Sequence, residues 1–163
     1  MSTSVTLLSP KTRAEIDKWL KKFPADQKQS AVIAALTAAQ AENGGWLTTA
    51  LMDAVAACLQ MPKIAVYEVA SFYSMFELKP VGKHKICVCT NISCMLNGSQ
   101  NIVDYLKKKL AIEMGQTTPD GKFTLKSVEC LAACGGAPAM QIGPQYYENL
   151  NCETVDEILA SLE

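Results

Sequence analysis

Val128-Glu129-Cys130-Leu131-Ala132-Ala133-Cys134-Gly135-Gly136-Ala137-Pro138 is the stretch around which this sequence is organised. It places two thiols, Cys130 and Cys134, at the end of an apolar run. Two glycines and a proline follow, and these residues prevent the chain from continuing as a strand or a helix. We therefore predict a loop that presents sulfur to a ligand.

A second cysteine pair, Cys89 and Cys94, follows another apolar run, and 35 residues separate it from the first. Four thiolates on two loops suit a 2Fe-2S or 4Fe-4S cluster, and also a tetrahedral zinc ion. Neither pair has the two-residue spacing of a dithiol redox enzyme. The halves of a zinc site usually lie about 12 to 20 residues apart. The longer separation favours a binuclear cluster, with zinc, a tetranuclear cluster and free thiols as alternatives.

Cys87 competes with Cys89 as a ligand, because alternate residues of a strand point to the same face. We choose Cys89, since the polar segment 90–93 follows it and suits a loop, whereas Val88 continues the strand after Cys87. Cys152 is expected to be a free thiol, and Cys58 a small buried side chain on an apolar helix face.

Composition excludes several classes of protein. The chain has 163 residues, is 49% hydrophobic and carries a formal net charge of -1, so it can fill a core and has no basic surface suited to nucleic acid. Its apolar runs are far shorter than the roughly 20 residues that cross a bilayer. Residues 1–5 lack the features of a secretion signal, so we expect the seven cysteines to lie in a reducing compartment.

The first half of the chain has helical periodicity. We expect four helices: from Ser9-Pro10 to Pro24, from about 27 to 42, after a cap at Thr48 or Thr49, and from Pro62 onward. Short connections predict an antiparallel bundle. The aromatic run Phe72-Tyr73-Ser74-Met75-Phe76 is expected to serve mainly in packing, with a partner surface as the alternative.

A second domain is expected after the linker 79–82. We predict a buried strand at 85–89, a helix after Asn97-Gly98-Ser99, hairpins around Asp120-Gly121 and Gly143-Pro144, and a last helix opened by a capping box at Thr154. This is an α/β pattern with helices on the faces of a sheet and with cysteine loops after the strand ends. The predicted domains are 1–78 and 83–163.

The motifs of both cysteine loops resemble a known family. Cys89-Thr90-Asn91-Ile92-Ser93-Cys94-Met95-Leu96-Asn97-Gly98, Asp120-Gly121-Lys122-Phe123-Thr124-Leu125 and Glu129-Cys130-Leu131-Ala132-Ala133-Cys134 with Ala137-Pro138 are similar to the thioredoxin-like 2Fe-2S subunit of NADH:quinone oxidoreductase, respiratory complex I, often called its E subunit. The resemblance extends to Gly44-Gly45-Trp46-Leu47 and to the aromatic run, and so covers most of the chain. Ala132 stands where glycine is common, and Gly135-Gly136 replace a frequently more polar pair.

The resemblance implies a helical bundle followed by a thioredoxin-like domain, with one 2Fe-2S cluster held by Cys89, Cys94, Cys130 and Cys134. It implies two partners: a flavoprotein subunit that binds FMN and NADH, and a larger iron-sulfur subunit of the peripheral arm. The chain would then work on the cytoplasmic face of a membrane complex, or in the mitochondrial matrix if it is eukaryotic and processed, without entering the membrane or binding nucleic acid.

The function so implied is one-electron transfer within a multi-subunit NADH dehydrogenase, with no catalytic residue in this chain alone. Backbone donors in the loops 90–93 and 135–137 are expected to hydrogen-bond the sulfurs and raise the cluster's potential. An alternative is the equivalent small subunit of an NAD-linked hydrogenase or formate dehydrogenase. An alternative of another class is a non-catalytic zinc-binding interaction module.

Overall fold

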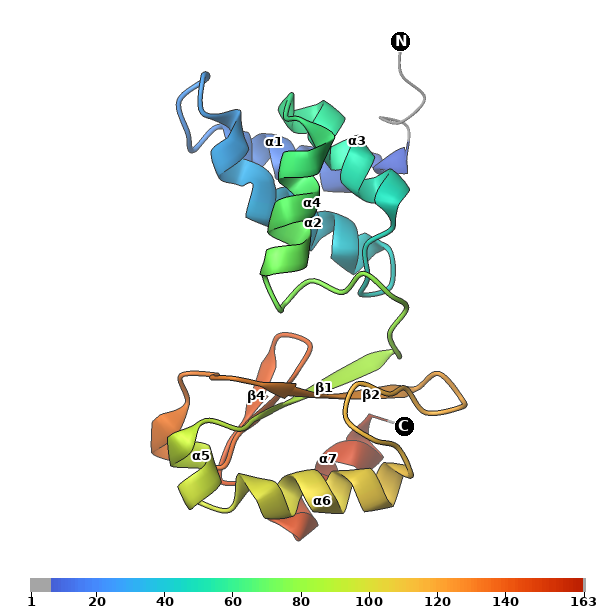
Figure 1. Ribbon diagram of the computed structural model, residues 1–163, viewed down its shortest axis with the longest axis vertical. Coiled ribbons are helices and arrows are strands. Elements are labelled where there is room, and N and C mark those ends of the chain that lie inside the picture. Colours follow the sequence, from blue (N-terminus) through green and yellow to red (C-terminus); the bar gives the residue numbers. More distant parts are fainter. Residues whose placement is uncertain (1–6, 163) are drawn as a thin grey trace. The chain divides into compact units, whose positions relative to one another are not determined.

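The computed structural model describes residues 7–162, so the predicted absence of a secretion signal at residues 1–5 concerns residues outside the described part. Two compact units make up the chain, the first ending at Pro80 and the second beginning at Val81 (Figure 1). The domain bounds 1–78 and 83–163 remain our proposal. Among residues 7–162, none of the helices is long and apolar enough to span a bilayer.

The first unit is helical. Its elements are α1 (Pro10–Leu20), the 3-10 turn η2 (Lys28–Ala31), α2 (Val32–Glu42), α3 (Thr49–Leu59) and α4 (Lys63–Phe72). Ser9 caps α1 and Thr48 caps α3, as predicted. The second predicted helix begins later than residue 27, because neither Gln27 nor Ala31 supplies a side-chain cap and the first turn is 3-10.

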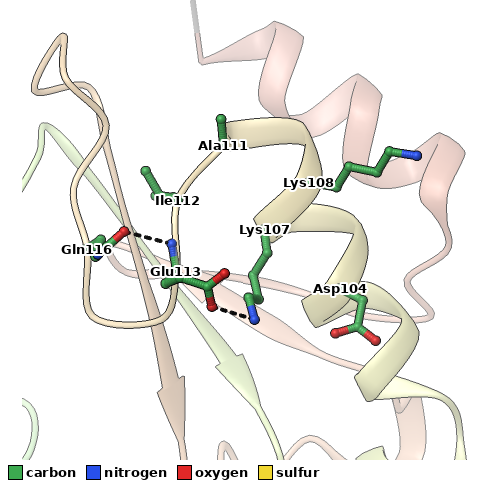
Figure 2. A pocket seen from close by; sticks show the side chains of 7 residues that line it. All are labelled: Asp104, Lys107, Lys108, Ala111, Ile112, Glu113 and Gln116. Atoms are coloured by element: carbon green, nitrogen blue, oxygen red, sulfur yellow. Dashed lines mark hydrogen bonds and ion pairs between the residues drawn. The ribbon is translucent and has the colours of Figure 1, made fainter.

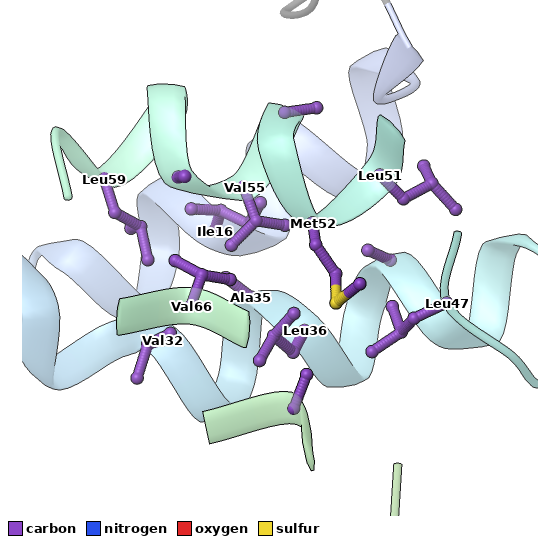
Figure 3. Close-up of a cluster of buried hydrophobic side chains, with 14 of the residues drawn as sticks. Ile16, Val32, Ala35, Leu36, Leu47, Leu51, Met52, Val55, Leu59 and Val66 are labelled. Carbon is purple, nitrogen blue, oxygen red and sulfur yellow. The ribbon is translucent and has the colours of Figure 1, made fainter. Parts of the chain in front are cut away.

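One apolar core holds the four helices together. Figure 3 shows Ile16, Leu36, Val55 and Val66, one from each helix, converging on the same centre, and each of these side chains is fully buried. Close packing of such branched side chains stabilises each helix far more than its intrinsic propensity does. Cys58 is half-buried at the margin of this core rather than inside it.

The aromatic run was predicted mainly to pack, and for two of its three rings this was wrong. Phe76 is buried, but 80% of Phe72 and 41% of Tyr73 are exposed. The buried side of α4 carries Val66 and Ala70, four positions apart, and Phe72 projects from another face because two residues turn a helix by about 200°.

The second unit is a four-stranded sheet with helices on one face. Its elements are β1 (His84–Cys89), α5 (Ile92–Leu96), α6 (Ser99–Leu110), β2 (Phe123–Val128), the 3-10 turn η3 (Cys134–Gly136), β3 (Met140–Ile142), β4 (Gln145–Tyr147) and α7 (Cys152–Ser161). The strand order is β2-β1-β3-β4, with β1 and β2 parallel and the other pairs antiparallel. The α/β class is confirmed.

The helices lie on one face of the sheet rather than on both. Ile86 and Val88 of β1 pack in one core with residues of α6 and α7 (Figure 1). The opposite face carries the alternate positions, including Lys85, Lys126 and Gln141. Because polar side chains line that face, no second helical layer of this unit is needed there.

Two further details correct the sequence prediction. The last helix begins at Cys152, with Asn151 as its cap, and Thr154 occupies the N3 position, the last residue of the capping box rather than its first. The residues before Cys94 were predicted as a loop, but the Asn91 side chain caps the short helix α5. The predicted hairpin at Gly143-Pro144 joins β3 and β4, and Asp120-Gly121 forms a turn before β2.

Candidate metal centre

The two cysteine loops leave the sheet at the same edge. β1 and β2 are parallel neighbours, and their last residues, Cys89 and Val128, lie directly opposite each other. The Thr90 N–H donates to the Val128 carbonyl at 3.0 Å, which joins the loops where they begin. This is the edge of an α/β sheet at which ligands usually bind.

The first loop holds a buried thiol pair. Cys89 and Cys94 are 3% and 2% exposed, and they pack around the fully buried Ala139. The Cys89 N–H donates to the Ala139 carbonyl at 3.0 Å, and the Ala139 N–H donates to the Cys94 sulfur. The segment before β3 thus supports both sulfurs of the first loop.

Hydrogen bonds separate the acidities of these two thiols. Burial raises the pKa of Cys89, but the N–H groups of Asn91 and Leu131 and the Cys94 thiol donate to its sulfur and together hold that pKa below its ordinary value. Burial raises the pKa of Cys94, and donation to Cys89 raises it further. The pair therefore favours one thiolate that accepts and one thiol that donates.

The second loop presents its thiols openly. Cys130 and Cys134 are both exposed, and the Ala132 N–H donates to the Cys130 sulfur at 3.3 Å. Ala132 adopts a left-handed backbone with φ of 55°, the region that favours glycine. This conformation agrees with the pattern of the family that the motifs resemble, in which glycine is common at this position.

The backbone donors to sulfur are only partly those predicted. Asn91 lies in the predicted segment 90–93. The other donors are Leu131 and Ala132 of the second loop and Ala139, directly before β3. The predicted segment 135–137 instead donates within its own turn, because the N–H groups of Gly136 and Ala137 bond the carbonyls of Ala133 and Cys134.

Glu148 packs directly against Gly136. A Cβ at Gly136 would lie 2.6 Å from the Glu148 Cβ, while a Cβ at Gly135 would meet nothing within 4 Å. The Asn149 N–H also donates to the Gly136 carbonyl at 2.6 Å. The absence of a side chain at Gly136 thus lets the segment before α7 close over the second loop.

The four predicted ligands form a contacting buried pair beside two exposed thiols. Cys134 lies near enough for its charge to raise the pKa of Cys94, after the larger effects of burial and of donation to Cys89. Among residues 7–162, no three Cys, His, Asp or Glu side chains converge as for a single metal ion. Two pairs on adjacent loops fit a binuclear iron-sulfur core, which takes four cysteine thiolates, two at each iron.

The other three cysteines are placed apart from this pair of loops. Cys87 is buried two residues earlier on β1, Cys152 is exposed at the start of α7, and Cys58 lies in the first unit. The sequence does not predict that the backbone N–H groups of Leu131 and Ala139 donate to sulfur, because every residue type except proline has this group. The Asn91 cap could have been found from its residue type.

A separate surface hollow of the second unit lies at the C-terminal end of α6 (Figure 2). Two of its charged side chains pair: Lys107 lies 2.5 Å from Glu113, whose backbone N–H donates to the Gln116 side chain at 2.9 Å. No cysteine lines it. We assign no chemistry to this hollow.

Comparisons with known proteins converge on one family. Residues 16–163 match the family described as thioredoxin-like [2Fe-2S] ferredoxin. The E subunit of the NADH-quinone oxidoreductase of Rickettsia prowazekii (strain Madrid E) is 48% identical over 140 residues, which are 86% of this chain and 79% of that protein. The corresponding protein of Rickettsia bellii (strain RML369-C) is 44% identical over 99% of this chain and 98% of its own length.

Two further proteins are similar to this chain. The Dictyostelium discoideum protein named NADH dehydrogenase [ubiquinone] flavoprotein 2, mitochondrial, is 43% identical over 91% of this chain and 60% of its own length. A crystal structure of an NAD+-reducing [NiFe]-hydrogenase in the air-oxidized state superposes with a TM-score of 0.70 at 20% identity, covering 83% of this chain and 24% of that one. At that identity the hydrogenase match establishes the fold alone.

Proposed function

The chain belongs to the thioredoxin-like [2Fe-2S] ferredoxin family, and from this premise we propose that it is the electron-transfer subunit of an NADH:quinone oxidoreductase, the one called the E subunit in its relatives. Its cofactor is one 2Fe-2S cluster. The observation that supports this function best is the placement of two cysteine loops at one edge of the sheet, joined by the bond from Thr90 to Val128.

We propose Cys89, Cys94, Cys130 and Cys134 as the cluster ligands. When bound, the cluster accepts and releases single electrons. The chain's own part is to place two thiolates on each loop and to donate N–H groups to sulfur from Asn91, Leu131, Ala132 and Ala139. Such donors stabilise negative charge on sulfur and so favour the reduced state. Burial of the first pair limits the access of water to that half of the site.

We further propose the partners of this subunit. A hydride donor such as NADH delivers two electrons to a flavin, so a one-electron carrier must work beside a flavoprotein. We therefore assign it an FMN- and NADH-binding flavoprotein subunit and the larger iron-sulfur subunit of the peripheral arm. The proposed location is that arm, on the cytoplasmic face of the membrane complex or in the mitochondrial matrix.

Cluster analysis of the anaerobically prepared protein tests the ligand set. We expect about two irons and two acid-labile sulfides per chain, a reddish-brown colour and a spin-resonance signal after reduction. Cys130→Ser should lose most of the iron and the visible absorption. Cys87→Ser, at a cysteine of β1 outside the proposed ligand set, is the control and should retain both. Zinc alone in wild-type protein made with ample iron and sulfide would contradict the proposal.

A further inference from the structure

Both cysteine loops lie in stretches without charge. No residue from Ile86 to Val103 is charged, and none from Cys130 to Tyr147. With 19% charged residues in the chain as a whole, each of these stretches would carry about three charges at the average rate. The charges that border the second loop along the chain are Glu129 and Glu148, one at each end of its uncharged stretch. Both are carboxylates, so the charge at this margin is negative.

Glu148 is the carboxylate whose position the fold determines. Its side chain lies across Gly136, because a Cβ at Gly136 would be 2.5 Å from the Glu148 Oε2 atom and 2.7 Å from its Cδ. Two backbone bonds hold the chain in this place. The Asn149 N–H donates to the Gly136 carbonyl at 2.6 Å, and the next N–H, of Leu150, donates to the Pro138 carbonyl at 3.1 Å. The carboxylate is therefore held against the second cysteine loop.

The charge of Glu148 has no counter-ion nearby and lies close to a thiol. Among residues 7–162, no lysine, arginine or histidine side chain forms an ion pair with it. Gly136 and Cys134 share the three-residue turn η3, which rises about 2 Å per residue, so the carboxylate lies on the order of 10 Å from the Cys134 sulfur. At such a distance near a protein surface, one unit charge changes the equilibrium for adding another by about threefold to tenfold.

We infer that Glu148 lowers the reduction potential of the cluster that the two loops hold. The inference rests on the proposed ligand set. Reduction adds an electron to a site that four thiolates already make negative, so a carboxylate beside it disfavours the reduced state. The N–H groups that donate to the sulfurs act in the opposite direction. The potential of the site is therefore a balance between backbone donors and this one side chain.

A series of charges at residue 148 tests the inference on the cluster-loaded full chain. The measurement is a redox titration followed by spin resonance. Glu148→Asp keeps the charge and should change the equilibrium between oxidised and reduced cluster by less than about twofold. Glu148→Gln keeps the shape without the charge and should favour the reduced state about threefold, which raises the potential by about 28 mV at 59 mV per tenfold. Glu148→Lys should favour it about ninefold, or about 56 mV.

A distant carboxylate provides the matched control. Glu113 follows α6, a helix of 12 residues that begins directly after α5 and is about 18 Å long at 1.5 Å per residue. This length exceeds the Debye length of about 8 Å at 0.15 M salt. Glu113→Gln should therefore change the equilibrium by less than about 1.5-fold, although it removes the same charge from the chain.

The salt dependence separates an effect of charge from an effect of structure. Raising the salt concentration from about 0.01 M to about 1 M shortens the Debye length from about 30 Å to about 3 Å. The difference in potential between the wild-type chain and Glu148→Gln should therefore shrink over this range. A difference that stays constant would come from a change in loop structure and would overturn the inference.

Iron content is measured on every variant, so that each outcome decides. Equal potentials for the wild-type chain and Glu148→Gln, both carrying two irons, overturn the role of Glu148 alone. Loss of iron from Glu148→Gln also overturns it, because the residue would then be needed to hold the cluster rather than to set its potential. A wild-type chain that takes up no binuclear cluster overturns the proposed ligand set together with this inference.

Discussion

The two cysteine loops start side by side but are built differently. The first closes into the helix α5, and its two thiols are 3% and 2% exposed. The second is irregular apart from the three-residue turn η3, and both of its thiols are exposed. One half of the site is therefore formed by the chain's own packing. The other half is held by a few backbone bonds and depends more on what binds to it.

The strongest test of this contrast is Gly136→Ala against Gly135→Ala. The new methyl group at residue 136 would collide with Glu148, at 2.6 Å from its Cβ, and overpacking of this kind costs about 1–3 kcal/mol. At residue 135 nothing lies within 4 Å, so we expect a change of less than about 0.5 kcal/mol. Urea unfolding of the metal-free protein measures both. Equal losses would mean that the chain packs as closely around residue 135 as around residue 136.

A smaller effect should distinguish the buried thiol pair from the exposed one. Cys94→Ser replaces the sulfur that accepts from the Ala139 N–H and donates to Cys89 with a smaller oxygen, which weakens both bonds in a buried site, so the metal-free protein should lose about 1 kcal/mol of unfolding free energy. Cys130→Ser should change it by less than about 0.5 kcal/mol, because that side chain is exposed. Both variants should lose the cluster, so only the unfolding free energy of the metal-free protein distinguishes the two loops. A larger loss for Cys130→Ser would reverse the contrast.

The smallest expected effect concerns His84, at the opposite end of β1 from Cys89. It is a change in the free energy of unfolding with pH. Burial lowers the pKa of His84 below 6.5, nearby Lys83 and Lys122 add to this, and a bond to the Leu162 backbone opposes it. The Nε2 atom is buried without a hydrogen-bond partner. The neutral form is thus favoured on folding, so stability is complete above about pH 6.5 and falls as the pH drops from there toward the folded-state pKa.

His84→Gln removes this titration, and His84 is the chain's single histidine. Unfolding of the metal-free wild-type protein by urea should therefore show a decline between about pH 7 and 5.5 that the variant lacks. If the unfolding free energies of the two proteins changed with pH in parallel, His84 would not cause the decline. The titrating group would then have to be sought at the cysteine end of the sheet.

Much of the cysteine-bearing unit was predictable because local signals agree there. Apolar runs before Cys89 and Cys130 place two strand ends, and the glycines and proline after Cys134 place a loop. The Gly143-Pro144 turn fixes the last hairpin. These features depend on residue type over a few positions.

The rest depends on tertiary packing. Cys94 is buried because it packs against Ala139, and the close approach of the chain at Gly136 depends on Glu148; both partners lie on segments farther along the chain. The capping box was placed at Thr154 because threonine followed by glutamate matches the usual pattern, whereas Asn151 competes successfully for the cap. The exposure of Phe72 depends on which face of α4 packs against the other helices, and Val66 and Ala70 occupy that face.

Ala132 links the shape of the second loop to the sulfurs. Its left-handed backbone costs an alanine about 1–2 kcal/mol, and no side chain of its own compensates. Two neighbouring bonds help hold it, from Leu131 to the Cys89 sulfur and from Ala132 to the Cys130 sulfur. Linkage is reciprocal, so whatever makes this turn easier to adopt also makes the sulfurs easier to hold in place. Residue 132 offers no ligand atom, yet a substitution there can change the affinity of the cysteine sulfurs for their metal.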